Sequence, residues 1–324
     1  MKAVIPVAGV GTRLRPHTHT APKALLYVAG KPILGHIIDM VASIGVDEII
    51  LVVGHMGDRI RAFVAETYDV PIRAVVQREQ RGLGHAIFVA REAVGEGPLL
   101  VILGDTVFDL DLRPIVEGGE NLIGVKEVED PRRFGVVETD GRRIVGLVEK
   151  PEIPPTNLAV VGLYYFTESG RLFDSLEQVI RENIQTKGEY QLTDALQIML
   201  ERGERMFILP IEGWFDCGNR ETLLETNRYL LDRDAGEVQI RGSIVVPPVS
   251  VDPTARVSGS ILGPYVSVAG GASVEGSIIR DSILSRGAVV ERALLEGSLI
   301  GDNARVRGVG RRLNVGDSSE VDHG

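Results

Sequence analysis

Two aspartates are the first residues in this sequence whose surroundings suggest chemistry. Asp105 ends the apolar run LLVILGD, and Asp216 lies in WFDCG, just before a glycine turn. Open α/β sheets bind ligands at the carboxyl ends of their strands, so Asp105 is expected at a binding edge. Magnesium binds through one or two carboxylates together with phosphate oxygens and water. The two aspartates are therefore candidate Mg²⁺ ligands, although either could simply cap a turn.

The first strand-like run leads into a glycine-containing turn, AGVGTRLRP. Gly9 and Gly11 would let backbone amides approach a phosphate group, and Arg13 adds a planar set of donors. An ordinary turn between a strand and a helix can contain the same glycines. A dinucleotide-binding fold would have a third glycine where Leu14 stands, and a P-loop would have Gly-Lys followed by Ser or Thr. Both of these motifs are excluded.

The continuation of this turn resembles a known family. The run GVGTRLRPHTHTAPKALLYVAGKPIL, with Lys23 ten residues after Arg13, is similar to the signature of sugar-nucleotide pyrophosphorylases, in particular glucose-1-phosphate thymidylyltransferases and uridylyltransferases. Further segments follow in the family's order: Gln77 with GLGHAI, then LGDTVF, DPRRFGVVE, GLVEKP, NLAVVGLYYF, GEYQLTDA and WFDCGN. The resemblance implies an enzyme that joins a nucleoside triphosphate to a hexose 1-phosphate with Mg²⁺ and releases pyrophosphate.

The resemblance also implies a role for individual residues. Asp105 and Asp216 would bind Mg²⁺, and the catalytic residues would be Arg13, Lys23, Asp105 and Lys150. The residues expected to bind the nucleotide are Ala8, Gly9, Gly11, Thr12, Gln77, Gly82 and Asp105. The residues expected to bind the sugar phosphate are Gly135, Glu149, Lys150, Val160 and Lys187.

Two of these positions leave alternatives open. The amide of Gln77 offers a donor and an acceptor that match the imide edge of uracil or thymine, and Gly82 lets backbone reach the base. Lys187 stands where thymidylyltransferases commonly carry arginine; lysine keeps the charge without the bidentate fork, and it could be an exposed lysine with no role. His85 is expected to start a helix and to have no catalytic role.

The base preference stays open between dTTP and UTP. The segments PVAGVGTR and GLGHAI are more similar to uridylyltransferases, whereas FGVVE, LAVVGLYYF and LLETNRYLL are more similar to long thymidylyltransferases. The alternative functions are those of a bifunctional N-acetylglucosamine-1-phosphate uridylyltransferase, of a mannose-1-phosphate nucleotidyltransferase, or of a non-catalytic regulatory or scaffold homologue. The bifunctional reading is disfavoured because fewer than 90 residues follow Gly236, and His323 is the only histidine among them.

Residues 1–236 are predicted to form a Rossmann-like α/β domain with a mostly parallel, mixed sheet. The predicted strands are residues 2–7, 48–54, 99–105 and 158–166, with a pair over 134–151 joined by a turn at Asp140-Gly141. The predicted helices are residues 32–45, 58–68, 83–94, 193–203 and 219–234.

Residues 237–324 are predicted to form a left-handed β-helix. Apolar residues lie six apart at Val251 and Val257, at Val268 and Val274, at Ile283 and Val289, and at Leu294, Ile300 and Val306. Such a spacing, with three steps per coil, is typical of a triangular β-solenoid that points one aliphatic side chain inward at each step. A β-sandwich with coincidental spacing is the alternative. The flat faces of a solenoid predict a homo-oligomer.

Composition excludes several classes of protein. The 324 residues carry a formal net charge of −10, which argues against a nucleic-acid surface. No apolar run is long enough to span a membrane, and Met1 leads into a strand without a signal-peptide pattern. The single cysteine, Cys217, excludes an intrachain disulfide framework. We therefore expect a cytoplasmic enzyme whose partners are a pyrimidine nucleoside triphosphate and a sugar 1-phosphate.

Overall fold

The structure is a computed structural model that describes residues 1–308, 310 and 312–322 and contains two compact units. Unit 1 consists of Met1–Gly9 and Ile37–Trp214, and unit 2 consists of Val10–His36 and Phe215–Gly324. The segment 10–36 thus packs with the C-terminal part of the chain. The domain boundary expected after residue 236 stays a prediction, since packing divides the chain at other positions. His323 lies outside the described residues.

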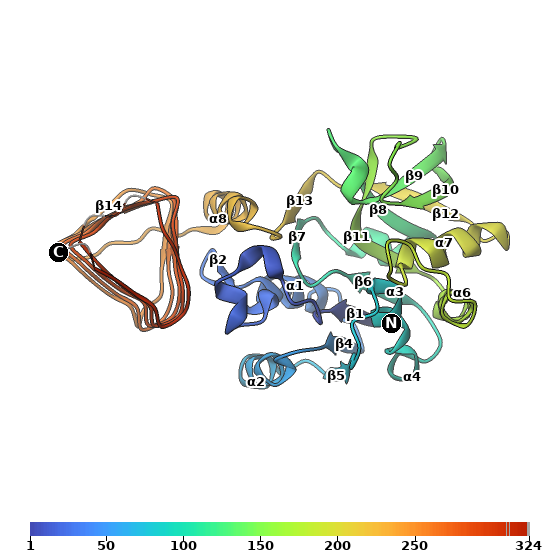
Figure 1. Cartoon of the computed structure of the whole chain (residues 1–324), viewed down its shortest axis with the longest axis horizontal. Helices are drawn as coiled ribbons and strands as arrows, with labels where there is room; N and C mark the ends of the chain where they lie inside the picture. The colour runs from blue at the N-terminus through green and yellow to red at the C-terminus, as the bar shows by residue number, and fades with distance from the viewer. Residues whose placement is uncertain (309, 311, 323–324) are drawn as a thin grey trace. The chain divides into compact units, whose positions relative to one another are not determined.

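A nine-stranded mixed sheet forms the centre of unit 1 (Figure 1). Its strand order is β5-β4-β1-β6-β11-β8-β12-β10-β9; the first four strands are parallel, and β11 pairs with β6 in the antiparallel sense. The strands are β1 (Lys2–Pro6), β4 (Glu48–Val53), β5 (Ile72–Val76), β6 (Leu99–Ile102), β8 (Asn121–Glu127), β9 (Gly135–Asp140), β10 (Arg143–Glu149), β11 (Leu158–Phe166) and β12 (Met206–Pro210). The predicted α/β architecture is confirmed.

The helices of unit 1 close its main hydrophobic core, because α3, α4, α6 and α7 contribute buried apolar residues to one cluster with the sheet. The helices are α2 (Gly57–Thr67), α3 (Leu83–Phe88), α4 (Arg91–Val94), α5 (Arg113–Glu117), α6 (Ser169–Arg181) and α7 (Leu192–Glu201), with a 3₁₀ turn η4 (Pro131–Arg133). Helix α1 (Ile33–Ala42) and strand β13 (Gly213–Asp216) each have residues in both units, and β7 (Thr106–Asp109) lies in unit 1.

Most predicted elements are present, and the differences have local causes. The hairpin of β9 and β10 has Asp140 opposite Arg143, with Gly141 at φ 59° in the turn. The single helix predicted over residues 83–94 is wrong: α3 and α4 are separate, because the amide of Ala90 bonds to the carbonyl of Ile87 and tightens the chain into a turn. Elements β5, β7, β8, β12, α5 and α6 were not predicted.

Unit 2 contains three parallel sheets whose strands follow one another around a triangle, seen nearly end on in orange to red in Figure 1. The sheets have the strand orders β14-β17-β20-β23, β15-β18-β21-β24-β26 and β16-β19-β22-β25-β27. This arrangement is consistent with the predicted β-helix. The strands are β14 (Ile244–Val245), β15 (Val249–Val251), β16 (Arg256–Ser258), β17 (Ile261–Leu262), β18 (Val266–Val268), β19 (Ser273–Glu275), β20 (Ile278–Arg280), β21 (Ser282–Leu284), β22 (Val289–Glu291), β23 (Leu294–Glu296), β24 (Leu299–Ile300), β25 (Arg305–Arg307), β26 (Asn314–Val315) and β27 (Glu320–Asp322).

The inward register predicted for part of the β-helix is wrong by one residue. Val268 pairs with Leu284, and Val274 with Val290, so these coils advance by 16 residues, whereas Val251 and Val268 are 17 apart. Because alternate side chains of a strand point to opposite faces, one missing residue exchanges inside and outside. The core residues are therefore Leu284, Val290 and Leu295 instead of Ile283, Val289 and Leu294.

The remaining elements of unit 2 are one long helix and the turns of segment 10–36. Helix α8 (Arg220–Asp234) begins at Asn219, whose side chain accepts a hydrogen bond from the amide of Thr222 in a reciprocal capping box. Segment 10–36 contains the 3₁₀ turns η1 (Thr12–Leu14), η2 (His17–His19) and η3 (Lys23–Leu25) and the short strands β2 (Tyr27–Val28) and β3 (Lys31–Pro32). Among the described residues, no helix combines the length and the apolar character that a membrane span requires.

The corrected register predicts different stability effects for two adjacent valines. Val290 is 0% exposed and Val289 is half-buried. Val290→Ala should lower the free energy of unfolding by about 2 kcal/mol, because two buried methyl groups are lost and a cavity remains. Val289→Ala, the matched control, should change it by less than about 0.5 kcal/mol. Urea unfolding measures both free energies. A larger loss of stability in Val289→Ala than in Val290→Ala would support the register predicted from the sequence.

Candidate active site

The parallel half of the unit 1 sheet gathers several predicted site residues at one edge. Ala8 and Gly9 follow β1, Gln77 follows β5, and Asp105 follows β6, all at the carboxyl ends of parallel strands. The backbone amide of Gln77 donates to the carbonyl of Val53 at 2.8 Å, so the sheet pairing continues up to this residue. This edge is where open α/β sheets bind their ligands.

Backbone packing fixes Asp105 beside the end of β1. The amide of Gly104 donates to the carbonyl of Pro6 at 3.2 Å, and a β-carbon at Gly104 would overlap the side chain of Val7. Only glycine allows this approach. The carboxylate of Asp105 accepts a 3.4 Å hydrogen bond from the Thr106 hydroxyl.

Gln77, Gly82 and His85 form one hydrogen-bonded group. The Gln77 side-chain nitrogen donates to the carbonyl of Gly82 at 3.2 Å and lies 3.1 Å from Nδ1 of His85. Gln77 is buried. Gly82 has φ 105°, and a β-carbon there would lie 2.5 Å from the carbonyl oxygen of Tyr190, so the turn before α3 requires glycine.

The electrostatics of this group favour neutral His85. Burial lowers the pKa of His85, and the positive charge of Arg81 lowers it further. A neutral ring can accept the amide hydrogen of Gln77 at Nδ1. His85 lies in the first turn of α3, as expected from the sequence, but its contact with Gln77 was not predicted.

A second group of predicted residues lies where β9 begins and β10 ends. Gly135 pairs directly with Glu149, and a β-carbon at Gly135 would come within 3.2 Å of Glu149 Oε2. Glu149 accepts a 2.7 Å hydrogen bond from the Thr193 hydroxyl and lies 3.2 Å from Nζ of Lys150. Lys150 has φ 43°. The carboxylate is thereby held between a hydroxyl and an ammonium group.

The remaining predicted residues of unit 1 are Val160, which is buried, and Lys187, which is exposed. Val160 lies in β11, where a register shift between Val160 and Tyr164 interrupts the pairing with β8. Lys187 lies in a tight turn closed by Thr186 and Glu189, and its Nζ is 3.8 Å from Glu152. Both side chains of that ion pair are mostly exposed, so the pair contributes little.

Five predicted residues lie in unit 2. Gly11, at φ 66°, precedes η1, which contains Thr12 and Arg13, while Lys23 begins η3 and is buried. Asp216 ends β13. The predicted residues thus form two groups within unit 1, while unit 2 contains the segment with Gly11, Thr12, Arg13 and Lys23 and, separately in sequence, Asp216.

The donor set suits a metal that takes most of its ligands from substrate. Among the described residues, no group of three or more His, Cys, Asp or Glu side chains could hold a metal ion. Asp105 and Asp216 offer hard carboxylate oxygens, which Mg²⁺ accepts singly or in pairs while phosphate and water complete its shell. The residue types therefore fit a magnesium–nucleotide complex.

Sequence reasoning missed the residues that support the site. Thr193 lies in the quoted segment GEYQLTDA, but nothing in that segment showed that its hydroxyl bonds to Glu149. Gln80 was also missed; its side chain donates to the carbonyl of Ala8 at 2.7 Å. Both contacts join residues far apart in the chain, so spacing could not reveal them.

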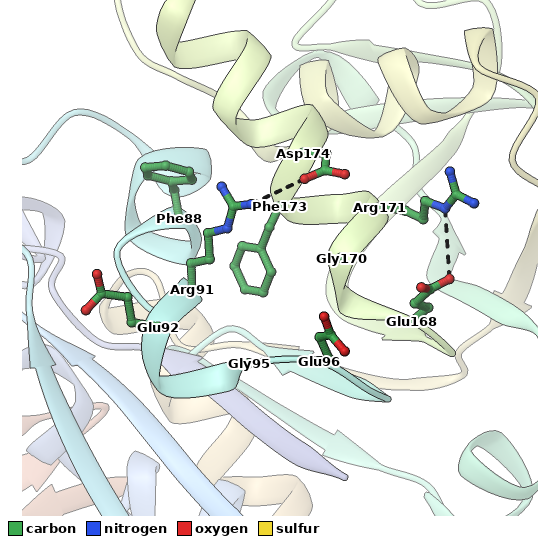
Figure 2. A pocket seen from close by; sticks show the side chains of 10 residues that line it. All are labelled: Phe88, Arg91, Glu92, Gly95, Glu96, Glu168, Gly170, Arg171, Phe173 and Asp174. Carbon is green, nitrogen blue, oxygen red and sulfur yellow. Dashed lines mark hydrogen bonds and ion pairs between the residues drawn. The ribbon is translucent and has the colours of Figure 1, made fainter.

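A separate cavity of about 790 Å³ opens between α3, α4 and α6 in unit 1 (Figure 2). Its lining includes Phe88 and Phe173, together with Arg91 and Arg171. Arg91 pairs with Asp174 at 3.3 Å, and Arg171 lies 3.9 Å from Glu168, as the dashed lines in Figure 2 mark. None of the predicted site residues is among the described residues that line this cavity.

The fold is an open α/β sheet followed in the chain by three parallel sheets consistent with a β-helix, and several predicted site residues lie at the edge where open sheets bind ligands. Residues 2–233 match the family model described as nucleotidyl transferase. The chain therefore belongs to the nucleotidyl transferase family, and the expected enzyme class is confirmed. Nucleotidyl transferases of this family generally use a divalent metal.

Similar proteins carry different substrate names. A glucose-1-phosphate thymidylyltransferase of Streptomyces griseus is 32% identical over 99% of both chains. The bifunctional protein GlmU of Methanocaldococcus jannaschii is 35% identical, over 76% of this chain and 60% of that protein. A UDP-glucose pyrophosphorylase solved with UDP-glucose is 26% identical, with a TM-score of 0.65 over 72% of this chain and 99% of that one.

The lowered pKa of His85 predicts a titration below the usual value of 6.5. Because the folded protein favours the neutral ring, the unfolded chain binds more protons between the folded pKa and 6.5. The free energy of unfolding should therefore fall as pH decreases through that window and be retained above it. NMR titration measures the pKa, and His85→Gln should remove this part of the pH dependence. A midpoint at or above 6.5 would contradict the effect of burial.

Proposed function

We propose that this protein transfers a nucleotidyl group from a pyrimidine nucleoside triphosphate, dTTP or UTP, to glucose 1-phosphate. The products are a nucleoside diphosphate glucose and pyrophosphate. One observation carries the proposal: Ala8, Gly9, Gln77 and Asp105 share one edge of the parallel sheet in a chain of the nucleotidyl transferase family. The names of the S. griseus enzyme and of the UDP-glucose pyrophosphorylase support the substrate class.

The bonding of Gln77 supports selection of uracil or thymine. Its side-chain nitrogen has partners in Gly82 and His85, which leaves the carbonyl oxygen of the amide to accept a hydrogen bond. The N3–H group of uracil or thymine can donate that bond, whereas N3 of cytosine is itself an acceptor. The tight turn at Gly82 would add backbone contacts to the base.

The group around Glu149 supports a sugar-phosphate site. Glu149 offers a carboxylate that can accept hydrogen bonds from sugar hydroxyls, with its orientation fixed by Thr193. Lys150 supplies a positive charge next to it for the phosphate. Gly135, Val160 and Lys187 are proposed as further contacts of the sugar phosphate.

The proposed reaction needs no covalent intermediate. An oxygen of the sugar phosphate attacks the α-phosphorus in line, and the bond from that phosphorus to the bridging oxygen breaks as pyrophosphate leaves with the electron pair. Arg13 and Lys23 would neutralise the triphosphate, with backbone amides of Gly11 and Thr12 nearby. Lys150 would orient the attacking phosphate.

We propose Mg²⁺ as the divalent metal, held by Asp105 and Asp216. When bound, it would neutralise charge on the phosphate oxygens during transfer. Asp105 lies in unit 1 and Asp216 in unit 2.

We further propose a homo-oligomer with left-handed β-helices that acts in the cytoplasm. The hexad spacing is the reason for the proposed hand. On the β14-β17-β20-β23 sheet, Ile244, Ile261, Ile278 and Leu294 stack in register on the outer side. Ile244 and Ile278 are 59% and 47% exposed. A flat apolar row of this kind suits a second copy of the chain.

An activity matrix tests the proposed reaction. Purified protein is assayed for pyrophosphate release with UTP, dTTP, CTP, ATP and GTP against the 1-phosphates of glucose, N-acetylglucosamine and mannose. We expect activity with UTP or dTTP and glucose 1-phosphate. Asp105→Asn and Arg13→Ala should each lower turnover by about 100-fold or more, since each removes charge stabilisation. Gln77→Ala should reduce the preference for UTP or dTTP over CTP.

Arg59→Ala, in α2, is the matched control for Arg13→Ala and should keep normal turnover. Circular dichroism checks that every variant is folded. Absence of pyrophosphate release with every pair would refute the enzymatic proposal and favour the scaffold alternative. Activity with N-acetylglucosamine 1-phosphate alone would replace the proposed sugar. Near-normal turnover of a folded variant would refute the role of that residue.

Ile278→Glu should lower the oligomeric state. A charge in the middle of the exposed row would have to be buried without a partner in the assembly, which is costly. Ser273→Glu places the same charge on another face of the β-helix and should leave the assembly intact. Sedimentation velocity measures both. A monomeric unaltered protein, or an Ile278→Glu variant that assembles normally, would refute this interface.

A further inference from the structure

One face of the β-helix is covered over strands β18, β21 and β24 by other parts of unit 2. On the sheet of β15, β18, β21, β24 and β26, five residues stack in register on the outer side. They are Ser250, Ser267, Ile283, Leu299 and Asn314. Their neighbours on the same strands form the inner core. This outer row, the covered row, differs from the exposed apolar row described above.

Segment 10–36 covers the apolar part of the covered row. Ile283 and Leu299 point away from the coil interior, yet they are only 3% and 4% exposed. They line one small cavity together with His17 and Tyr27 of the segment. The segment therefore rests on the β-helix through η2 and the start of β2, which flank the turn that contains Lys23.

Polar contacts fix the same segment to the last coil. The His17 ring, which is 4% exposed, lies with Nε2 2.7 Å from Oδ1 of Asn314. The Asn314 amide nitrogen also donates to the carbonyl of Arg15 at 3.5 Å. The hydroxyl of Thr20 donates to the carboxylate of Asp317. These contacts join residues almost 300 positions apart.

A buried asparagine of α8 fixes the other end of the segment. Asn227 is 0% exposed, and its Oδ1 accepts hydrogen bonds from the amide of Ala29 at 2.9 Å and from the hydroxyl of Ser267 at 2.6 Å. Its amide nitrogen donates to the carbonyl of Tyr265 at 3.3 Å. One side chain thus connects the segment, the helix and the covered row.

The segment is closed internally as well. The Thr18 hydroxyl donates to the carbonyl of Gly11 at 2.8 Å, and a β-carbon at Gly11 would lie 3.0 Å from Cβ of Lys23. Thr18 lies between the anchored residues His17 and Thr20. Displacement of the anchors would therefore be transmitted to Gly11 and Lys23.

We propose that the β-helix positions the triphosphate-binding turns of this enzyme, and that Asn314 and Asp317 are positioning residues for nucleotide binding. The inference rests on the proposed function, because it assigns Arg13 and Lys23 to the triphosphate. The segment consists of short turns that could not hold one geometry unaided, since ordering a chain costs conformational entropy. The covered row supplies that order before the nucleotide binds.

Kinetics and hydrogen exchange of Asp317→Ala and Asn314→Ala test the proposal. Each variant should raise KM for the preferred nucleoside triphosphate by about tenfold, the effect of one lost hydrogen bond. KM for glucose 1-phosphate should change by less than about twofold, since Glu149 and Lys150 lie in unit 1. Amide exchange in peptides from residues 10–36 should become faster. Asp317→Asn keeps an acceptor for Thr20 and should restore most of the affinity.

Glu320→Ala is the matched control, because it removes another carboxylate from the last coil at an exposed position. It should change neither KM nor exchange. Equal increases in both KM values, or unchanged exchange in residues 10–36, would overturn the proposal. Amide exchange does not depend on the reaction. If the unaltered protein has no transferase activity but Asp317→Ala still shows faster exchange in residues 10–36, only the proposed function is refuted.

Discussion

The shared direction of β5, β4, β1 and β6 is the constraint on which the proposed active site depends. Parallel strands end at the same edge, so the residues that follow them meet there whatever their distance in sequence. Gln77 and Asp105 follow β5 and β6 at this edge, and close backbone packing at the neighbouring Gly82 and Gly104 supports the turns that contain or follow them. A β-carbon would overlap the side chain of Val7 at Gly104 and the backbone of Tyr190 at Gly82.

A second constraint is electrostatic. A chain with a net charge of −10 must hold particular cations in place if it is to bind two phosphate-bearing substrates. Lys150 is paired with Glu149, whose other oxygen accepts from Thr193. Lys23 is buried within a segment that is fixed at both ends. In both places hydrogen bonds between residues remote in sequence determine where the positive charge lies.

The β-helix illustrates how one simple repeat can serve several purposes. Most of its inner strand residues are aliphatic on all three sheets, because each coil must bury them; buried Ser282 is an exception. The outer rows differ: one is apolar and exposed, one is covered by segment 10–36 and α8, and the third carries charged residues such as Arg256, Arg305 and Glu320. Strand alternation makes the inner and outer residues independent of each other.

Local sequence signals determined many of the elements, the family and the types of residue proposed for the site. Periodicity located most long helices and strands, and the quoted segments carried the resemblance that the family match confirmed. The six-residue spacing failed to predict the core where a coil has 16 residues instead of 17, so that Leu284 and not Ile283 lies in the core. Only the tertiary structure decided that segment 10–36 packs on the last coils, that Thr193 orients Glu149, and that His85 bonds to Gln77. These contacts join residues with no fixed spacing, and their energies depend on burial and distance, which exist only once the chain has folded.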